Sequence, residues 1–315
     1  MSGIAENLKK ALWEQIWYEK NGYYNALAPD VRAKITALHR ELLDQQRSAV
    51  SVMAGGEPLP KGDSTNIPKP VESVTSEPLS DPVHDPRLYS FDGRKLWIPW
   101  AKEIDSGVRR GTRRQKYPEG ALVHWTAGHR NGLAAGAELM TSSGMNYFIV
   151  DKDGNVGQPD PLSEWGYHAG ESKYFELNGT VADELVGFEC QAAGNLTKYN
   201  GNFYPWWDGG KRLPSNIIPA DQVVECKREE NIAPGYYHEL TQAQMVALRK
   251  GLCWLHLNYP SVFKIKFILG HDEVSPGRKT DPGGALMNPQ GQPITMEELR
   301  DWIALDVKTI ISNRK

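Results

Sequence analysis

Two histidines, a lysine and an aspartate carry the chemistry that this sequence suggests first. His271 directly follows the apolar run 262–269, and Lys279 and Asp281 come a few residues later, among prolines and glycines. These prolines and glycines predict a stiff, turn-rich loop that is not helical. Such a loop can fold back and place Asp281 beside His271. The two side chains would form two-thirds of a catalytic metal site.

A third ligand is available far upstream at His124, which ends the apolar run 121–124. If both apolar runs are strands of one parallel or mixed sheet, the two imidazoles meet at the same edge, where open α/β sheets bind ligands. Two histidines and one carboxylate suit zinc and leave a position for water. From the spacing alone, however, a strand-terminal histidine is more often a hydrogen-bonded residue than a metal ligand.

The composition excludes several classes of function. The chain has 315 residues and a formal net charge of -3, so no global basic field favours a nucleic-acid partner. No run of apolar residues is long enough for a transmembrane segment. The three cysteines form no CxxC pair. Residues 1–10 lack the apolar core of a signal peptide, so we expect synthesis in the cytoplasm.

Three regions follow one another along the chain. Residues 1–50 show two helical patterns and predict a small helical N-terminal module. Residues 51–87 are rich in proline, glycine, serine and acidic residues, which predicts an extended linker. Residues 88–315 are expected to form the catalytic domain. The module at 1–50 is a candidate for contact with a protein partner or for docking to a cell wall.

Within residues 88–315, predicted strands alternate with helices. Strands are expected at 121–124, 146–150, 156–158 and 185–190, and helices at 131–140 and 241–256, with a further helix at the C-terminus. The two later helices begin with capping boxes at Thr241 and Thr295. This alternation predicts an α/β fold, with a central mixed β-sheet flanked by helices.

Several segments occur in the order known from one enzyme family. They are the strand end VHWTAG with His124, the hairpin NYFIVDKDGNVGQ, the tetrapeptide YHAG, the strand VGFE and the loop GHDEVSPGRKTDPG. Over roughly residues 118–286, the chain resembles the zinc-dependent N-acetylmuramoyl-L-alanine amidases, which are related to peptidoglycan recognition proteins. The resemblance implies an amidase-like fold. It also implies one Zn²⁺ per catalytic domain, held by His124, His271 and Asp281.

The resemblance also implies roles for other residues. The substrate would be the amide between N-acetylmuramic acid and L-alanine of the peptidoglycan stem peptide. Glu189 matches the family's general base, and Lys279 matches the lysine that stabilises the oxyanion. His168 is interpreted as a substrate-positioning residue. Asn146 stands where many relatives have Tyr or His, and its neighbour Tyr147 is expected to point to the opposite face of the strand.

The stretch 194–237 is longer than a simple connection requires and contains several aromatic residues, including Trp206 and Trp207. It shows no clear periodicity, and long loops of this kind are often functional. We therefore interpret it as a loop that forms a cleft wall, with both tryptophans in contact with sugar or peptide. Packing of these aromatics onto the domain is an equal alternative.

Three biological roles remain open from the sequence. A non-catalytic peptidoglycan-binding module is disfavoured, because both the ligands and the catalytic residues are present. A cytosolic amidase that recycles anhydro-muropeptides is a second possibility. A phage lysin or a delivered cell-wall effector accounts best for the N-terminal module and linker. This last role implies action in the periplasm or cell wall after release or delivery.

Overall fold

The computed structural model of the protein describes residues 81–105, 108–128, 130–227 and 232–314. The expected helical module at 1–50 and most of the expected linker lie outside these residues. No helix in the described ranges is long and apolar enough to cross a membrane. The described residues belong to one compact unit, which begins at Pro78.

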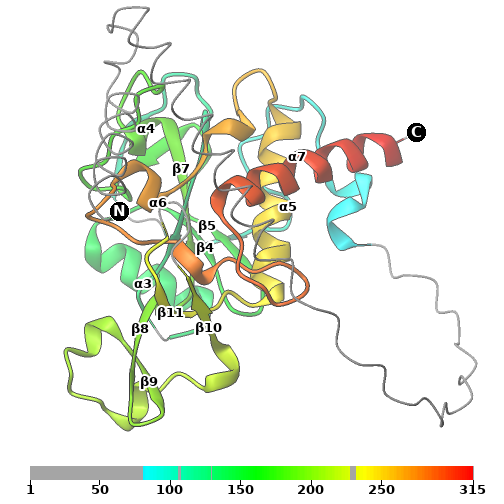
Figure 1. Ribbon diagram of the computed structural model, residues 1–315. Helices are drawn as coiled ribbons and strands as arrows, with labels where there is room; N and C mark the ends of the chain where they lie inside the picture. The colour runs from blue at the N-terminus through cyan, green and yellow to red at the C-terminus, as the bar shows by residue number, and fades with distance from the viewer. Residues whose placement is uncertain (1–80, 106–107, 129, 228–231, 315) are drawn as a thin grey trace, which may run out of the picture. The chain divides into compact units, whose positions relative to one another are not determined.

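A six-stranded mixed sheet forms the centre of this unit (Figure 1). The strands are ordered β1-β5-β4-β7-β3-β12. Neighbours β4, β7, β3 and β12 are parallel, whereas β5 runs antiparallel to β4 and pairs in parallel with β1. The strands are β1 (Lys102–Glu103), β3 (Gly120–Trp125), β4 (Phe148–Val150), β5 (Val156–Gln158), β7 (Leu185–Cys190) and β12 (Ile268–Gly270). The expected α/β fold with a central mixed sheet is confirmed.

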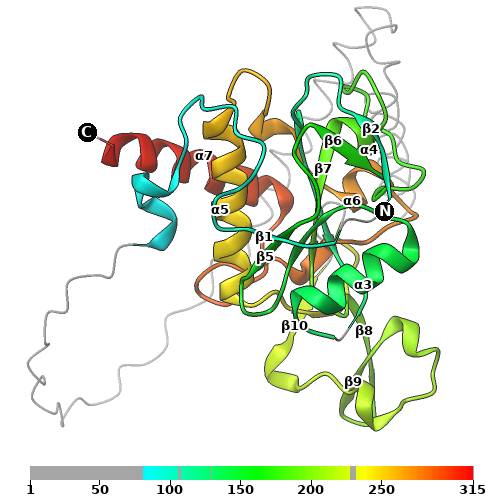
Figure 2. The same ribbon diagram turned by 180° about the vertical axis from the view of Figure 1, so that it is seen from behind.

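One face of the sheet is covered by α5 (Gln242–Asn258) and α7 (Met296–Asn313) (Figures 1 and 2). Alternate strand residues such as Val123, Phe188 and Ile268 point into this apolar core. Both helices begin with the expected capping boxes, at Thr241 and Thr295, so their N-termini are confirmed. This packed face holds the central strands in fixed register.

The opposite face is covered by shorter helices: α3 (Leu133–Ser143), α4 (Val181–Glu184) and α6 (His271–Val274) (Figure 2). Here α3 approaches β4 closely, because Gly136 has no side chain: a Cβ at this position would lie 2.7 Å from Ile149. Leu122 and Leu269 pack beside α4 and α6. His124 and Glu189 follow the same strand alternation and also point to this face.

The stretch 194–237 contains a second sheet, so the expectation of one long loop was wrong. Four antiparallel strands lie in the order β10-β11-β8-β9. They are β8 (Asn195–Tyr199), β9 (Asn202–Pro205), β10 (Val223–Cys226) and β11 (Gly235–His238). Asn200 and Gly201 both have positive φ and connect β8 to β9. An Asn-Gly pair between two short strands is a strong hairpin signal, which the sequence reading overlooked.

The segment after β12 also differs from expectation. Residues 262–269 were predicted as one strand, but a 3-10 turn precedes the three-residue strand β12. His271–Val274 then forms one helical turn, although a loop without helix was expected. The prolines at 276 and 282 restrict only the residues near them, so they do not prevent a helical turn at 271–274. The Glu273 side chain caps this turn by accepting a hydrogen bond of 2.8 Å from the backbone N–H of Gly270. The cap stabilises the turn.

The folded unit includes residues 81–87, which were expected to end the linker. Val83 is fully buried, and Arg249 forms an ion pair with both Asp306 and Asp81, at 2.7 Å and 3.0 Å. His84 also lies 2.8 Å from Asp306. The predicted linker therefore extends too far toward the C-terminus. Proline-rich composition did not distinguish a linker from a proline-containing segment that packs on α7.

The remaining elements are short. A two-stranded antiparallel sheet joins β2 to β6 beside the site-bearing face. Brief 3-10 turns connect the larger elements. These elements are β2 (Arg109–Thr112), β6 (Glu164–Gly166) and the 3-10 turns Pro82–His84, Pro86–Leu88, Trp206–Asp208, Pro214–Asn216, Ala220–Gln222, Ile265–Phe267 and Gly283–Ala285.

Candidate metal centre

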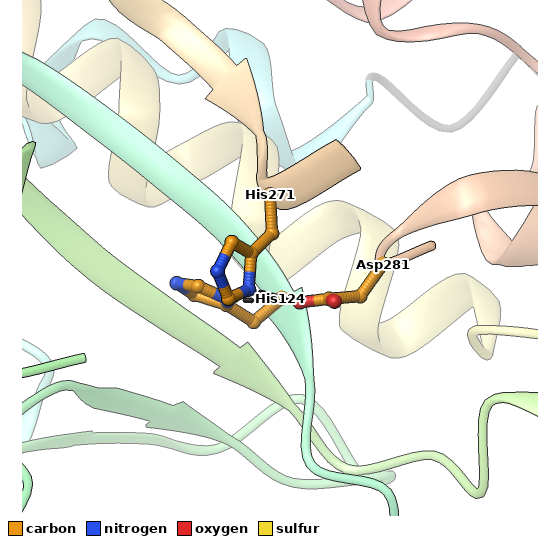
Figure 3. Close-up of side chains that lie close together, drawn as sticks. All are labelled: His124, His271 and Asp281. Carbon is orange, nitrogen blue, oxygen red and sulfur yellow. Dashed lines mark hydrogen bonds and ion pairs between the residues drawn. The ribbon is translucent and has the colours of Figure 1, made fainter. Parts of the chain in front are cut away.

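Three expected ligands meet at one edge of the central sheet (Figure 3). His124 lies near the end of β3, His271 begins α6 directly after β12, and Asp281 lies in the loop that follows α6. Strands β3 and β12 are parallel neighbours, so both histidines emerge at their carboxyl ends, as expected. Asp281 returns to this edge because its carbonyl accepts a hydrogen bond from the Asp272 backbone N–H at 2.8 Å.

The ligand atoms form a tight triangle. Nδ1 of His124 and Nδ1 of His271 lie 2.9 Å apart, and each lies 2.9 Å from Oδ2 of Asp281. All three side chains are buried, with exposed fractions of 1%, 3% and 4%. Two imidazole nitrogens and a carboxylate oxygen are a ligand set that suits zinc. Among the described residues, His124, His271 and Asp281 form the one cluster of side chains close enough together to hold a metal ion.

Burial and charge favour the unprotonated ligands. Burial lowers the pKa of His124 to about 4, although the neighbouring Asp281 carboxylate acts in the opposite direction. Burial alone would raise the pKa of Asp281, but the two neighbouring rings of His124 and His271 outweigh it and lower that pKa below its ordinary value. A neutral imidazole and an ionised carboxylate are the forms that bind a metal. The residues therefore fit a metal ion.

Glu189 lies directly beside this triangle. It is the register partner of His124 on the parallel strand β7, and it is 8% exposed. Its Oε2 is buried and has no hydrogen-bond partner among the described residues. Burial and the nearby Asp281 carboxylate raise the pKa of Glu189 well above its usual value. A carboxyl group with a raised pKa and an oxygen without a hydrogen-bond partner can both accept and return a proton.

Lys279 and Thr280 belong to the same loop as Asp281 and face the same cavity. Lys279 is half-buried, and its positive charge lowers the pKa of Glu189, although less than burial raises it. Thr280 donates a hydrogen bond of 2.7 Å to the side-chain oxygen of Asn195, the first residue of β8. The second sheet therefore supports the loop that carries Lys279 and Asp281.

The cavity around these residues has a volume of about 500 Å³. One wall is formed by Leu139 and Met145 at the end of α3, and another by Trp206 beside β9. These three apolar side chains are 42%, 37% and 56% exposed. Apolar walls around a polar, charged floor are typical of small-ligand sites.

The other expected site residues lie differently. His168 lines the cavity and is buried, with its ring beside that of His124. Trp206 lines the cavity, but Trp207 is not among its lining residues. Asn146 donates a hydrogen bond to Asp160 and does not line the cavity either. The substrate contacts expected of His168, Trp207 and Asn146 stay predictions.

Tyr147 lines the cavity, although the sequence placed it on the opposite side. Tyr147 lies two residues before Ile149, the register partner of Glu189, so it points to the site-bearing face, whereas the expectation had placed Asn146 on that face. The sequence analysis also missed the walls formed by Leu139 and Met145. A helical pattern in 131–140 was visible, but neither the position of α3 over the sheet nor its two exposed apolar side chains could be read from it.

A known protein family matches the part of the chain that carries this site. Residues 114–284 match the family Amidase_2, described as N-acetylmuramoyl-L-alanine amidase. No curated protein matches the chain. Several solved structures are similar to the chain at low identity. The first is a selenomethionine derivative of AmpD, at 19% identity and a TM-score of 0.40, with 62% of this chain and 93% of that chain covered.

Two further structures come from named bacteria. The endolysin N-acetylmuramoyl-L-alanine amidase LysCS from Clostridium intestinale URNW has 15% identity and a TM-score of 0.39, and the match covers 66% of this chain and 98% of that one. AmpDh3 from Pseudomonas aeruginosa has 14% identity and a TM-score of 0.36, with 62% and 61% covered. The family match spans more than half of the 315 residues and contains all three ligand positions. The chain belongs to the N-acetylmuramoyl-L-alanine amidase family.

Proposed function

We propose that this amidase binds one zinc ion through His124, His271 and Asp281 and uses it to cleave the amide between N-acetylmuramic acid and L-alanine. The observation that carries the proposal is the triangle of ligand atoms, 2.9 Å on each side, with the unpartnered oxygen of Glu189 beside it. A bound zinc ion polarises a carbonyl oxygen and lowers the pKa of a water molecule toward about 7.

The side chains of the cavity account for the proton transfers. Glu189 takes a proton from the attacking water while the oxygen of that water bonds to the amide carbon. The C–N bond then breaks, and Glu189 passes the proton to the leaving nitrogen of L-alanine. The products are the lactyl carboxylate of the sugar and the amine of the peptide, and the second proton of the water ends on that amine as an ammonium group or in the solvent. Lys279 stabilises the negative charge that develops on the carbonyl oxygen.

Metal removal tests the zinc proposal. Treatment with 1,10-phenanthroline should abolish release of stem peptide, and added Zn²⁺ should restore it. The released amine can be labelled and identified by mass spectrometry, which also establishes which bond is cleaved. Full activity in a preparation shown to be free of metal would contradict the proposal.

We further propose that intact peptidoglycan is the substrate and that the protein is a phage lysin or a delivered effector, acting in the periplasm or cell wall. The sequence N-terminal to the catalytic domain supports this role, because a predicted helical module and linker suit docking to a wall or to a delivery partner. The exposed Trp206 at the edge of the cavity is also accessible to a long glycan chain.

The biological role can be tested with two substrates. Purified sacculi and a soluble anhydro-muropeptide should be compared at equal concentrations of the scissile amide. A lysin or effector should release peptide from sacculi. Activity on the soluble fragment alone would instead support a cytosolic recycling amidase. Removal of residues 1–50 should then lower binding to sacculi and leave turnover of a soluble fragment unchanged.

A further inference from the structure

His168 lies directly behind His124, and both of its ring nitrogens have partners. It is 4% exposed, and its ring centroid lies 5.5 Å from that of His124. Its Nε2 lies 3.1 Å from the carbonyl oxygen of Leu185, at the start of β7. A carbonyl oxygen only accepts hydrogen bonds, so Nε2 of His168 carries the hydrogen and donates it. In the neutral ring, Nδ1 then keeps its lone pair.

This lone pair determines which ring nitrogen of His124 carries the proton. Nδ1 of His168 lies 3.2 Å from Nε2 of His124 and accepts a hydrogen bond from it. The proton of the neutral His124 ring is therefore on Nε2. Its Nδ1 presents a lone pair toward Oδ2 of Asp281, at 2.9 Å. A histidine binds a metal through the lone pair of a ring nitrogen, so binding through Nδ1 requires this tautomer.

Ala169, which follows His168, fixes the tautomer of the second histidine, His271. Nε2 of His271 donates a hydrogen bond of 2.9 Å to the carbonyl oxygen of Ala169. That bond places the proton of the neutral ring on Nε2 and leaves a lone pair on Nδ1, which faces Asp281 at 2.9 Å. Two consecutive residues thus orient both imidazoles, one through its side chain and the other through its backbone.

We propose that His168 and Ala169 form one positioning element, which fixes the tautomer and ring orientation of both histidine ligands, and that His168 acts on the metal through His124. The inference rests on the proposed zinc site. Outer partners of this kind typically change metal affinity by about 10- to 100-fold when they are lost. His168 is then a positioning residue for the metal ligand and not a substrate contact.

The sheet provides the space that His168 needs. Gly187 lies on β7, and a Cβ added there would lie 2.8 Å from both Cγ and Nδ1 of the His168 ring. Real side chains do not approach so closely, so any larger residue at 187 must displace the ring. Gly187→Ala therefore disturbs the His168–His124 hydrogen bond without removing any polar group.

The experiment compares zinc affinity among four full-length variants. His168→Leu removes both hydrogen bonds, and Gly187→Ala displaces the ring. His168→Gln can still donate to Leu185 and accept from His124. His256→Leu is the matched control. His256 lies on α5, on the other face of the sheet from the ligands, and its ring donates a hydrogen bond of 3.0 Å to the carbonyl of Phe263. Zn²⁺ affinity is measured by competition with a chromophoric chelator, and thermal unfolding of the metal-free proteins is recorded in parallel.

We expect His168→Leu and Gly187→Ala to bind Zn²⁺ about 10- to 100-fold more weakly than the natural protein. His168→Gln should recover most of this loss, and His256→Leu should keep the natural affinity. If His168→Leu does not fold, His168→Gln and Gly187→Ala still decide the question. Natural zinc affinity in both folded variants that disturb His168 would overturn the inference.

Two other results separate competing explanations. A higher KM with natural zinc affinity in His168→Gln and Gly187→Ala would assign His168 to substrate binding and overturn the positioning role. Failure of the natural protein itself to bind Zn²⁺ would overturn the proposed function, on which this inference rests. Nitrogen-15 NMR of the imidazoles gives an independent readout, since His124 should show a protonated Nε2 in the natural protein and lose this preference in His168→Leu.

Discussion

His124 and Glu189 are register partners on the adjacent parallel strands β3 and β7. Residues paired in this way point to the same face of a sheet, so the proposed metal ligand and the proposed proton acceptor lie side by side without help from any loop. The backbone hydrogen bonds of two buried strands therefore set the spacing of the reacting groups. A site built on such strands is held more rigidly than one built on loops.

Replacement of Glu189 should separate metal binding from turnover. Glu189→Gln removes the proton acceptor but keeps the size of the side chain, so kcat should fall by about 10²- to 10⁴-fold. Zinc content, measured by atomic emission, should stay at one ion per chain, because Glu189 is not part of the ligand triangle. Loss of zinc together with activity would show that Glu189 acts on the metal site instead.

Replacement of Lys279 should affect the transition state more than substrate binding. Lys279→Met keeps the apolar stem and removes the charge, so kcat should fall by about 10²- to 10³-fold with a small change in KM. Lys308→Met, on the exposed side of α7, is the matched control. A large rise in KM with an unchanged kcat would place Lys279 in ground-state binding.

The two neighbouring tryptophans should differ in their effects. Trp206 is 56% exposed and lines the cavity, so Trp206→Ala should raise KM by up to about tenfold, the size of a lost aromatic contact. Trp207→Ala serves as its control and should leave KM within error, since Trp207 is absent from the cavity wall. Equal KM values for the natural protein and Trp206→Ala would remove Trp206 from the binding site.

Acid should destabilise the protein partly through His238. Burial lowers the pKa of this side chain to about 3, and its Nδ1 accepts a hydrogen bond of 3.0 Å from the backbone N–H of Ala193. Unfolding returns the pKa to about 6.5, so the unfolded chain binds the proton more readily. The stabilisation by the neutral ring is complete above pH 6.5 and is lost progressively toward pH 3.

The measurement for His238 is the free energy of unfolding of the metal-free protein between pH 6.5 and pH 4.5. Its slope should be smaller in His238→Asn by up to about 1.4 kcal/mol per pH unit, the effect of one proton. Asparagine can still accept the Ala193 hydrogen bond, so stability near pH 7 should change less than the slope. Identical slopes in the two proteins would contradict a neutral, buried His238.

The buried ion pair between Arg249 and Asp306 should be important for stability. Their side chains are 3% and 1% exposed, and the two residues are joined at 2.7 Å between α5 and α7. Asp306→Ala leaves a buried positive charge without its main partner, so the free energy of unfolding should fall by about 3–5 kcal/mol. Arg130→Ala breaks the exposed pair with Glu138 and should have little measurable effect. Urea unfolding followed by circular dichroism distinguishes the two.

The sequence by itself determined the local features of this protein. The apolar runs that become β3 and β7, the capping boxes at Thr241 and Thr295, and the types of the three ligand residues could all be read from short windows. Such features depend on neighbouring residues, which propensity and capping rules describe. The family resemblance then connected the distant segments that carry the ligands.

Only the tertiary structure decided which side chains face the cavity. Tyr147 lines it and Asn146 does not, because Ile149 pairs in register with Glu189, and this register turns Tyr147 and not Asn146 toward the cavity. Trp206 and Trp207 are adjacent in sequence, yet only the first lines the cavity, since the 3-10 turn that carries them points neighbouring side chains in different directions.

The partners of His168 also depend on long-range packing. The carbonyl of Leu185 and the ring of His124 come from two strands that become neighbours only when the sheet forms. No local pattern around the tetrapeptide at 167–170 indicates these partners. The sequence thus identified which residues could do the chemistry. The register of the parallel strands, which is set by packing across the whole sheet, decided how they are oriented.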